Sequence, residues 1–158
     1  MKKIFSLGLL AAAMVIGFTA CDDDDDLPNV SFAVNFEDAA VVDGTVYVVQ
    51  GESFEIESVT PINNESSKAV EIGPVTYYWD YQALGVSTFK PYAFDIRVSP
   101  QTSTGQHRLE LACQVFALDK SPANALLSYP IVVVATEADL PAGGTTTIQY
   151  PQISEVDD

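Results

Sequence analysis

The chain has 158 residues, and its 22 acidic residues against 7 basic ones give a formal net charge of −15 at pH 7. This length predicts one domain with a single hydrophobic core. The composition argues against nucleic acid as a partner, because phosphate binding requires clustered Lys and Arg, whereas Lys68, Lys90, Arg97, Arg108 and Lys120 are scattered.

Residues 1–20 have the three parts of an export signal. Lys2 and Lys3 form a charged start, an apolar run extends from Ile4 to Phe18, and small residues follow. The run is shorter than the roughly 20 residues that a membrane-spanning helix needs. We therefore expect a signal peptide over residues 1–20 that is removed from the mature chain.

The segment Phe18-Thr19-Ala20-Cys21 closes this signal. It resembles the lipobox of bacterial lipoproteins, which implies that Cys21 becomes the lipidated first residue. An ordinary secretory signal with an unrelated cysteine is the alternative. Acyl chains contribute about 0.8 kcal/mol per buried methylene, so a multiply acylated Cys21 anchors the protein without spanning the membrane. The mature chain then has 138 residues and, with 5 basic against 22 acidic residues, a formal charge of −17.

Five consecutive aspartates, Asp22 to Asp26, follow the cysteine. Carboxylates are calcium ligands, but consecutive aspartates lack the alternating spacing of a calcium loop. Repulsion between like charges favours a solvated tether over residues 21–29. The run also resembles the surface-export signal of Bacteroidota-type lipoproteins, which implies an outer-membrane protein that faces the cell surface.

Short runs rich in Val, Ile, Tyr, Phe and Thr alternate with turn signals through the rest of the chain, a pattern typical of all-β domains. About seven to eight strands over residues 30–135 predict an immunoglobulin-like antiparallel β-sandwich. The tail, residues 136–158, adds one more expected strand. The expected strands are Val30 to Phe36, Thr45 to Val49, Ser53 to Thr60, Val75 to Tyr81, Val86 to Lys90, Tyr92 to Val98, Arg108 to Val115, Ala125 to Ala135 and Thr145 to Tyr150.

Three segments carry a resemblance to bacterial immunoglobulin-like and PKD-type domains: Gly51-Glu52-Ser53-Phe54, Tyr78-Trp79-Asp80, and Gly105 leading into Leu109, Leu111 and Val115. Tyr81-Gln82-Ala83 replaces the Gly-Asp-Gly that follows Trp-Asp in the PKD pattern. The inter-sheet disulfide of immunoglobulin domains does not carry over, because Cys21 is the only other cysteine. We expect Cys113 to be a buried free thiol that packs as a small hydrophobe.

No catalytic pattern is apparent. His107 lies six residues from Cys113, about 20 Å along an extended strand, so the two cannot meet there. Asp80 and Asp95 are a candidate glycosidase pair, but any chain with 22 acids supplies such pairs. Zinc-ligand spacings and phosphate-binding glycine loops are missing from the sequence. We expect a non-catalytic protein without a metal or cofactor.

Two functional hypotheses remain. The first is a lipid-anchored immunoglobulin-like module that binds a surface or envelope protein, or that spaces other parts at the cell surface. The alternative is a glycan-binding component of an outer-membrane polysaccharide-uptake system, in which exposed aromatic rings stack on sugars. The candidate stacking residues are Tyr78, Tyr81, Tyr92 and Trp79. Trp79 also fits the competing role of filling the space between two sheets.

Overall fold

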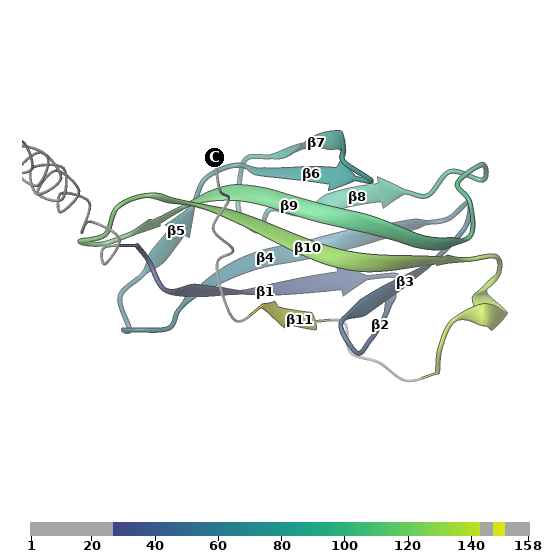
Figure 1. The fold of residues 1–158 in the computed structure, drawn as a ribbon, viewed down its shortest axis with the longest axis horizontal. Coiled ribbons are helices and arrows are strands. Elements are labelled where there is room, and N and C mark those ends of the chain that lie inside the picture. Colours follow the sequence, from purple (N-terminus) through teal and green to yellow (C-terminus); the bar gives the residue numbers. More distant parts are fainter. Residues whose placement is uncertain (1–26, 143–146, 151–158) are drawn as a thin grey trace, which may run out of the picture.

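The structure is a computed structural model that describes residues 27–142 and 147–150. In this part of the chain, runs of alternating apolar residues form strands that are arranged in two layers (Figure 1). The strands are β1 (Val30–Glu37), β2 (Ala40–Val42), β3 (Thr45–Val49), β4 (Ser53–Asn63), β5 (Val70–Ile72), β6 (Val75–Trp79), β7 (Gln82–Ser87), β8 (Phe94–Arg97), β9 (Gly105–Ala117), β10 (Ala123–Val134) and β11 (Thr147–Tyr150). A short 3-10 helix, η2, covers Glu137–Asp139.

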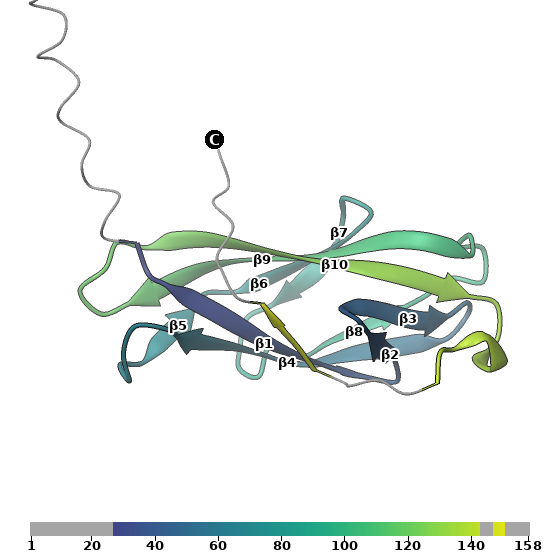
Figure 2. The same cartoon turned by 60° about the horizontal axis from the view of Figure 1, so that its bottom comes forward.

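The strand order confirms the predicted immunoglobulin-like sandwich. One sheet has the order β11-β1-β4-β8, and the other has the order β2-β3-β10-β9-β6-β7 with β5 beside β9. The order β1-β4-β8 corresponds to strands A, B and E of an immunoglobulin domain, and β10-β9-β6-β7 corresponds to G, F, C and C′. Figure 2 shows the two layers from a second direction. The pairing of β3 with β10 is parallel, unlike the other strand pairings of the described residues.

The core lies between the two sheets. On β9, Leu109, Leu111 and Val115 are fully buried, as their predicted alternation requires. They face the apolar side chains of β1 and β4, and an edge-to-face contact between Phe36 and Tyr129, with ring centroids 5.4 Å apart, links the two layers. Burial of these apolar surfaces is what holds the sheets together. Within the described residues, no helix is both long and apolar enough to cross a membrane.

The described residues form eleven strands, whereas seven to eight, plus one in the tail, were expected. The sequence pattern misses β2 and β5, which are only three residues long. The strand expected from Val75 to Tyr81 ends at Trp79. Asp80 and Tyr81 have φ values of 46° and 67°, the left-handed pair that closes a two-residue hairpin. The next strand therefore begins at Gln82 and ends at Ser87, earlier than the expected Val86 to Lys90.

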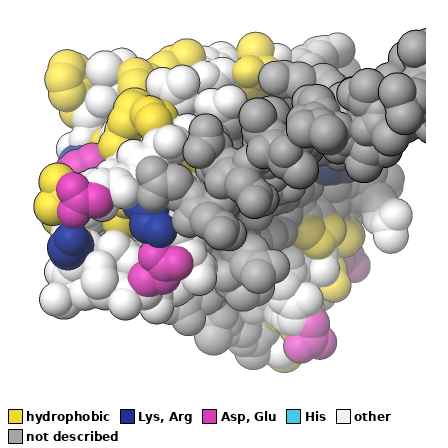
Figure 3. All heavy atoms as spheres, turned by 60° about the vertical axis from the view of Figure 1, so that its left-hand side comes forward, with side chains coloured by type: hydrophobic (Ala, Val, Ile, Leu, Met, Phe, Trp, Pro, Cys, Tyr) yellow, Lys and Arg dark blue, Asp and Glu magenta, His cyan; other side chains and the backbone are white. Residues whose placement is uncertain are grey.

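The sandwich has two ends with different chemistry. The described chain begins at what we call the proximal end, formed by residues 27–29, 64–69 and 117–122. Figure 3 views the molecule from this side. The Asn64 backbone N–H donates to the Asn29 carbonyl at 3.0 Å, and the two side chains also hydrogen-bond at 3.0 Å, so Asn29 is fixed to the β4–β5 loop. The opposite, distal end is formed by residues 38–40, 50–53 and 135–140.

The expected signal peptide, Cys21 and the aspartates Asp22 to Asp26 lie outside the described residues.

Candidate functional site

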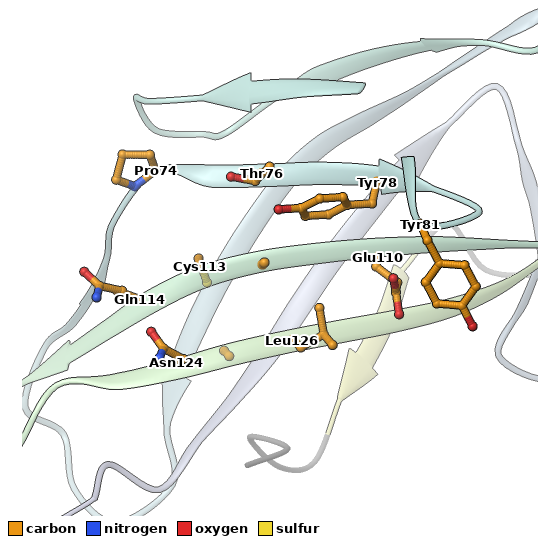
Figure 4. Close-up of a pocket in the computed structure, with 11 residues that line it drawn as sticks. Pro74, Thr76, Tyr78, Tyr81, Glu110, Cys113, Gln114, Asn124 and Leu126 are labelled. Atoms are coloured by element: carbon orange, nitrogen blue, oxygen red, sulfur yellow. The ribbon is translucent and has the colours of Figure 1, made fainter. Parts of the chain in front are cut away.

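A shallow groove with a volume of ≈ 530 Å³ crosses the outer face of β6, β9 and β10 (Figure 4). Because Leu109 and Leu111 point into the core, the alternation of β9 turns Glu110, Ala112 and Gln114 outward. Leu126, Ala112 and Thr76 are directly opposite one another on the three strands. The small side chain of Ala112 between two larger ones leaves the sheet face hollow.

Two tyrosines border the groove. Tyr78 is half-buried and projects from the outer face of β6, and Tyr81 follows in the hairpin turn with 72% of its surface exposed. The Arg108 guanidinium lies 5.4 Å from the centre of the Tyr81 ring, and its Nη1 donates to Tyr81 Oη at 3.2 Å. Arg108 Nε also contacts Glu110 Oε1 at 2.8 Å, although the Glu110 side chain is only 9% exposed. Arg108 therefore joins Tyr81 to a carboxylate in the groove.

Asp80 fixes the turn that carries Tyr81. Its backbone N–H donates to the Arg108 carbonyl, and its Oδ1 accepts the Arg108 backbone N–H, each at 2.9 Å. Its Oδ2 accepts from His107 Nδ1 at 2.7 Å. Asp95, its predicted catalytic partner, lies on β8 in the other sheet, directly opposite Glu55. The structure thus places the two carboxylates on different sheets, and Asp80 is bonded to β9.

His107 and Cys113 lie on the same strand but have separate partners. His107 Nε2 is 2.7 Å from the Ser103 carbonyl, and its other ring nitrogen contacts Asp80. Cys113 is a free thiol that is 8% exposed, and burial raises its pKa to about 12. A thiol with such a pKa is almost entirely protonated at neutral pH and is a poor nucleophile. Its burial agrees with the packing role expected for it.

Only two of the four predicted stacking residues lie in the groove. Tyr78 and Tyr81 do, whereas Trp79 is half-buried against the core, with its ring near Phe54 and His107. Trp79 therefore fills space between the sheets, the competing role considered for it.

Tyr92 is a correction to the expected set, because it is only 4% exposed and offers no ring face to a ligand. Its φ of 65° places it in a turn before β8, where its hydroxyl donates to the Ile72 carbonyl at 2.8 Å. Its own carbonyl accepts a hydrogen bond from the buried Tyr77 hydroxyl. The alternation that assigned Tyr92 to a strand misses this turn.

The polar residues of the groove were not identified as a site from the sequence. Glu110 and Gln114 follow from the predicted alternation of β9, which turns both outward, but nothing in the chain marks the strand as part of a groove. The strand expected to start at Ala125 instead starts at Ala123, which places Asn124 on β10 directly opposite Gln114 of β9. These residues come together only through the pairing register of β6, β9 and β10, and that register depends on contacts between segments that are far apart in the sequence. In the described part of the chain, no group of three or more His, Cys, Asp or Glu side chains is arranged to hold a metal ion.

Comparisons with known proteins give little further information. No family model matches the chain, and no curated protein is significantly similar to it. Among solved structures, the chain is similar to the fibronectin(III)-like modules of Clostridium thermocellum CbhA, with 17% sequence identity and a TM-score of 0.37. That match covers 65% of this chain and 99% of the other. No functional conclusion follows from a likeness of this degree, and the fold class rests on the strand order described above.

Proposed function

We propose that this chain is a lipid-anchored, non-catalytic immunoglobulin-like module that presents a binding face at the bacterial cell surface. The lipobox-like segment that ends at Cys21 supports the anchor, and the acidic run behind it supports display on the outer membrane. The binding face is the groove over β6, β9 and β10.

The observation that carries the binding role is the conformation of Tyr81. A non-glycine residue in the left-handed region costs roughly 1–2 kcal/mol, and a large ring that is 72% exposed recovers little of it by burial. Hydrogen bonds that Arg108 donates to Asp80 Oδ1 and to Tyr81 Oη hold the turn in place. Strained residues that their surroundings hold in position are concentrated at binding sites. The turn thus serves to present Tyr81 at the edge of the groove.

Protease shaving of intact cells tests whether the protein is exposed on the cell surface. The mature protein should be degraded while a periplasmic marker survives, and a Cys21→Ala variant should be lost from the membrane fraction. Protection of the protein until the cells are lysed would contradict surface display, and retention of the Cys21→Ala variant in the membrane would contradict lipid anchoring.

Glycan binding is the second candidate, and the composition of the groove favours it. The rings of Tyr78 and Tyr81 offer apolar faces to the C–H bonds of a sugar, and the exposed amides of Gln114 and Asn124 offer acceptors and donors to its hydroxyls. Ligand sites generally combine an apolar surface with a few polar groups that fix orientation. On this proposal the module is a glycan-binding component of an outer-membrane polysaccharide-uptake system.

A glycan screen with the Cys21→Ala protein tests this candidate. We expect at least one polysaccharide to be retained, and Tyr81→Ala to weaken that binding at least tenfold. Phe89→Ala is the matched control, because Phe89 is an aromatic residue that is 81% exposed, against 72% for Tyr81, and does not line the groove. Equal losses in both variants, or no retained polysaccharide, would contradict glycan binding at this groove.

A further inference from the structure

The large apolar side chains that the described residues expose fall into two groups. Tyr81, Leu84, Val86 and Phe89 lie on or beside the edge strand β7. Leu27, Phe116 and Leu118 lie at or next to the proximal end, with exposed fractions of 38%, 42% and 65%. Figure 3 shows hydrophobic side chains among charged ones on this side of the molecule. The second group has no role in the groove and needs a separate explanation.

The length of the chain before the sandwich limits where the proximal end can lie. Asn29 is hydrogen-bonded to Asn64, so the folded domain begins there. Cys21 is eight residues earlier, which spans at most about 28 Å when fully extended. If Cys21 is lipidated, as the proposed function holds, the proximal end stays within that distance of the bilayer surface. The distal end lies on the far side of the domain.

Charge also distinguishes the two ends. At the proximal end Lys68 Nζ lies 3.1 Å from Asp119, and Lys120 Nζ lies 3.6 Å from Glu65, so these four charges balance.

At the distal end, Asp38, Glu52 and Glu137 line a single hollow that has no Lys or Arg in its lining. Anionic headgroups repel this unbalanced acidic cluster more strongly than the paired charges of Lys68, Asp119, Lys120 and Glu65 at the proximal end. The long stems of Lys68 and Lys120 can also place their ammonium groups among the headgroups beside buried apolar side chains.

We infer that the proximal end is a second membrane contact, through which the domain rests on the phospholipid bilayer that holds its lipid anchor. Leu118, the first residue of the β9–β10 loop, enters the interfacial region together with Phe116, and Lys68 and Lys120 lie at the headgroup level. This contact stands the long axis of the sandwich away from the membrane. It therefore keeps the groove over β6, β9 and β10 open to the exterior.

Fluorescence quenching on vesicles tests the contact. Lipidated protein purified from membranes is reconstituted into vesicles of phosphatidylethanolamine and phosphatidylglycerol that contain a doxyl-labelled lipid. An environment-sensitive dye is attached at Ser121→Cys, an exposed residue of the β9–β10 loop, or at Glu137→Cys on η2 at the distal end. Cys113 is buried and remains unlabelled. We expect strong quenching of the Ser121 dye and none of the Glu137 dye.

A pair of matched double variants identifies the side chains responsible. Leu118→Ser with Phe116→Ser should reduce quenching of the Ser121 dye several-fold, whereas Leu84→Ser with Phe89→Ser, which removes exposed apolar side chains elsewhere, should leave it unchanged. Near-ultraviolet circular dichroism confirms that each variant is folded.

Vesicle flotation separates the two ways in which the inference can fail. Protein that floats with the vesicles but shows equal, weak quenching at both dyes would overturn the membrane contact while leaving the anchor intact. Protein that does not float would overturn lipid anchoring, and the contact with it.

Discussion

The Asp80 carboxylate and the His107 imidazole, 27 residues apart in the chain, meet at 2.7 Å and join the β6–β7 turn to β9. The other ring nitrogen of His107 faces the Ser103 carbonyl at 2.7 Å. Both nitrogens therefore face acceptors, an arrangement that only the protonated imidazolium satisfies with two donated hydrogen bonds. Burial lowers the pKa of His107, but the hydrogen bonds to Asp80 and Ser103 and the charge of Asp80 outweigh burial, so the pKa lies above its ordinary value of 6.5.

The first prediction concerns this pair. Because the folded-state pKa of His107 is raised, its contribution to stability is complete below pH 6.5 and is lost as the pH rises through the folded-state pKa. His107 is the only histidine, so its imidazole resonance can be titrated by NMR without overlap from a second one. We expect a midpoint above 6.5 that moves down in Asp80→Asn. A wild-type midpoint at or below 6.5 would contradict the assignment.

The second prediction separates stability from binding at Tyr81. Replacing Tyr81 by Gly relieves the left-handed strain of φ 67° and gives the hairpin a preferred turn residue, but it removes the contact with Arg108. We expect the free energy of unfolding to stay the same or to rise by up to about 1 kcal/mol, whereas ligand binding at the groove is lost. Urea denaturation and a binding assay on the same sample measure both. A large loss of stability would show that Tyr81 holds the fold together.

The layered all-β fold was predictable because its strongest signal is local. Leu109, Leu111, Cys113 and Val115 occupy alternate positions of one long strand, and this pattern alone gives both the strand and its buried face. The conformation of a turn is harder to predict from the sequence than a strand. Asp80-Tyr81 lacks the glycine of the Asn-Gly and Asp-Gly pairs that mark a two-residue hairpin turn, so the predicted strand continued through it.

The groove was only partly predictable for the same physical reason. Tyr78 and Tyr81 were selected for their aromatic rings, and Tyr92 was selected with them although it is buried. Exposure depends on which segments pack over a residue, and that is set by contacts between strands far apart in sequence. The register of the sheet, for example, places Leu126 of β10 and Thr76 of β6 directly opposite Ala112 of β9.

The third prediction concerns a close approach of β7 to the core. A Cβ atom at Gly85 would lie 2.9 Å from two carbon atoms of the Phe94 ring, which stacks on the buried Tyr77 ring with centroids 4.4 Å apart. Gly85→Ala should therefore force the Phe94 ring to move and lower the free energy of unfolding by roughly 1–3 kcal/mol. Combining it with Phe94→Leu should recover part of the loss, and additive losses in the double variant would contradict the steric explanation.

The fourth prediction follows from a row of like charges on the outer face of the smaller sheet. Glu37, Glu55 and Asp95 are directly opposite one another on β1, β4 and β8. Burial, then the charges of Asp95 and Glu37, and last the smaller effects of Glu57 and Asp38 raise the pKa of Glu55 above 4.5. Because its folded-state pKa is raised, protonated Glu55 favours the folded state. This contribution to the free energy of unfolding is complete below pH 4.5 and is lost as the pH rises through the folded-state pKa.

Glu55→Gln should accordingly be more thermostable than the wild type at pH 7, because directly opposed like charges destabilise a sheet. The difference should shrink as the pH approaches 4 and as salt screens the repulsion. Glu57→Gln, on the same strand but with no acid directly opposite it, is the matched control and should give a smaller gain. If both variants gained equally at pH 7, the gain would come from reducing the overall negative charge, and the cross-strand repulsion at Glu55 would have no measurable effect.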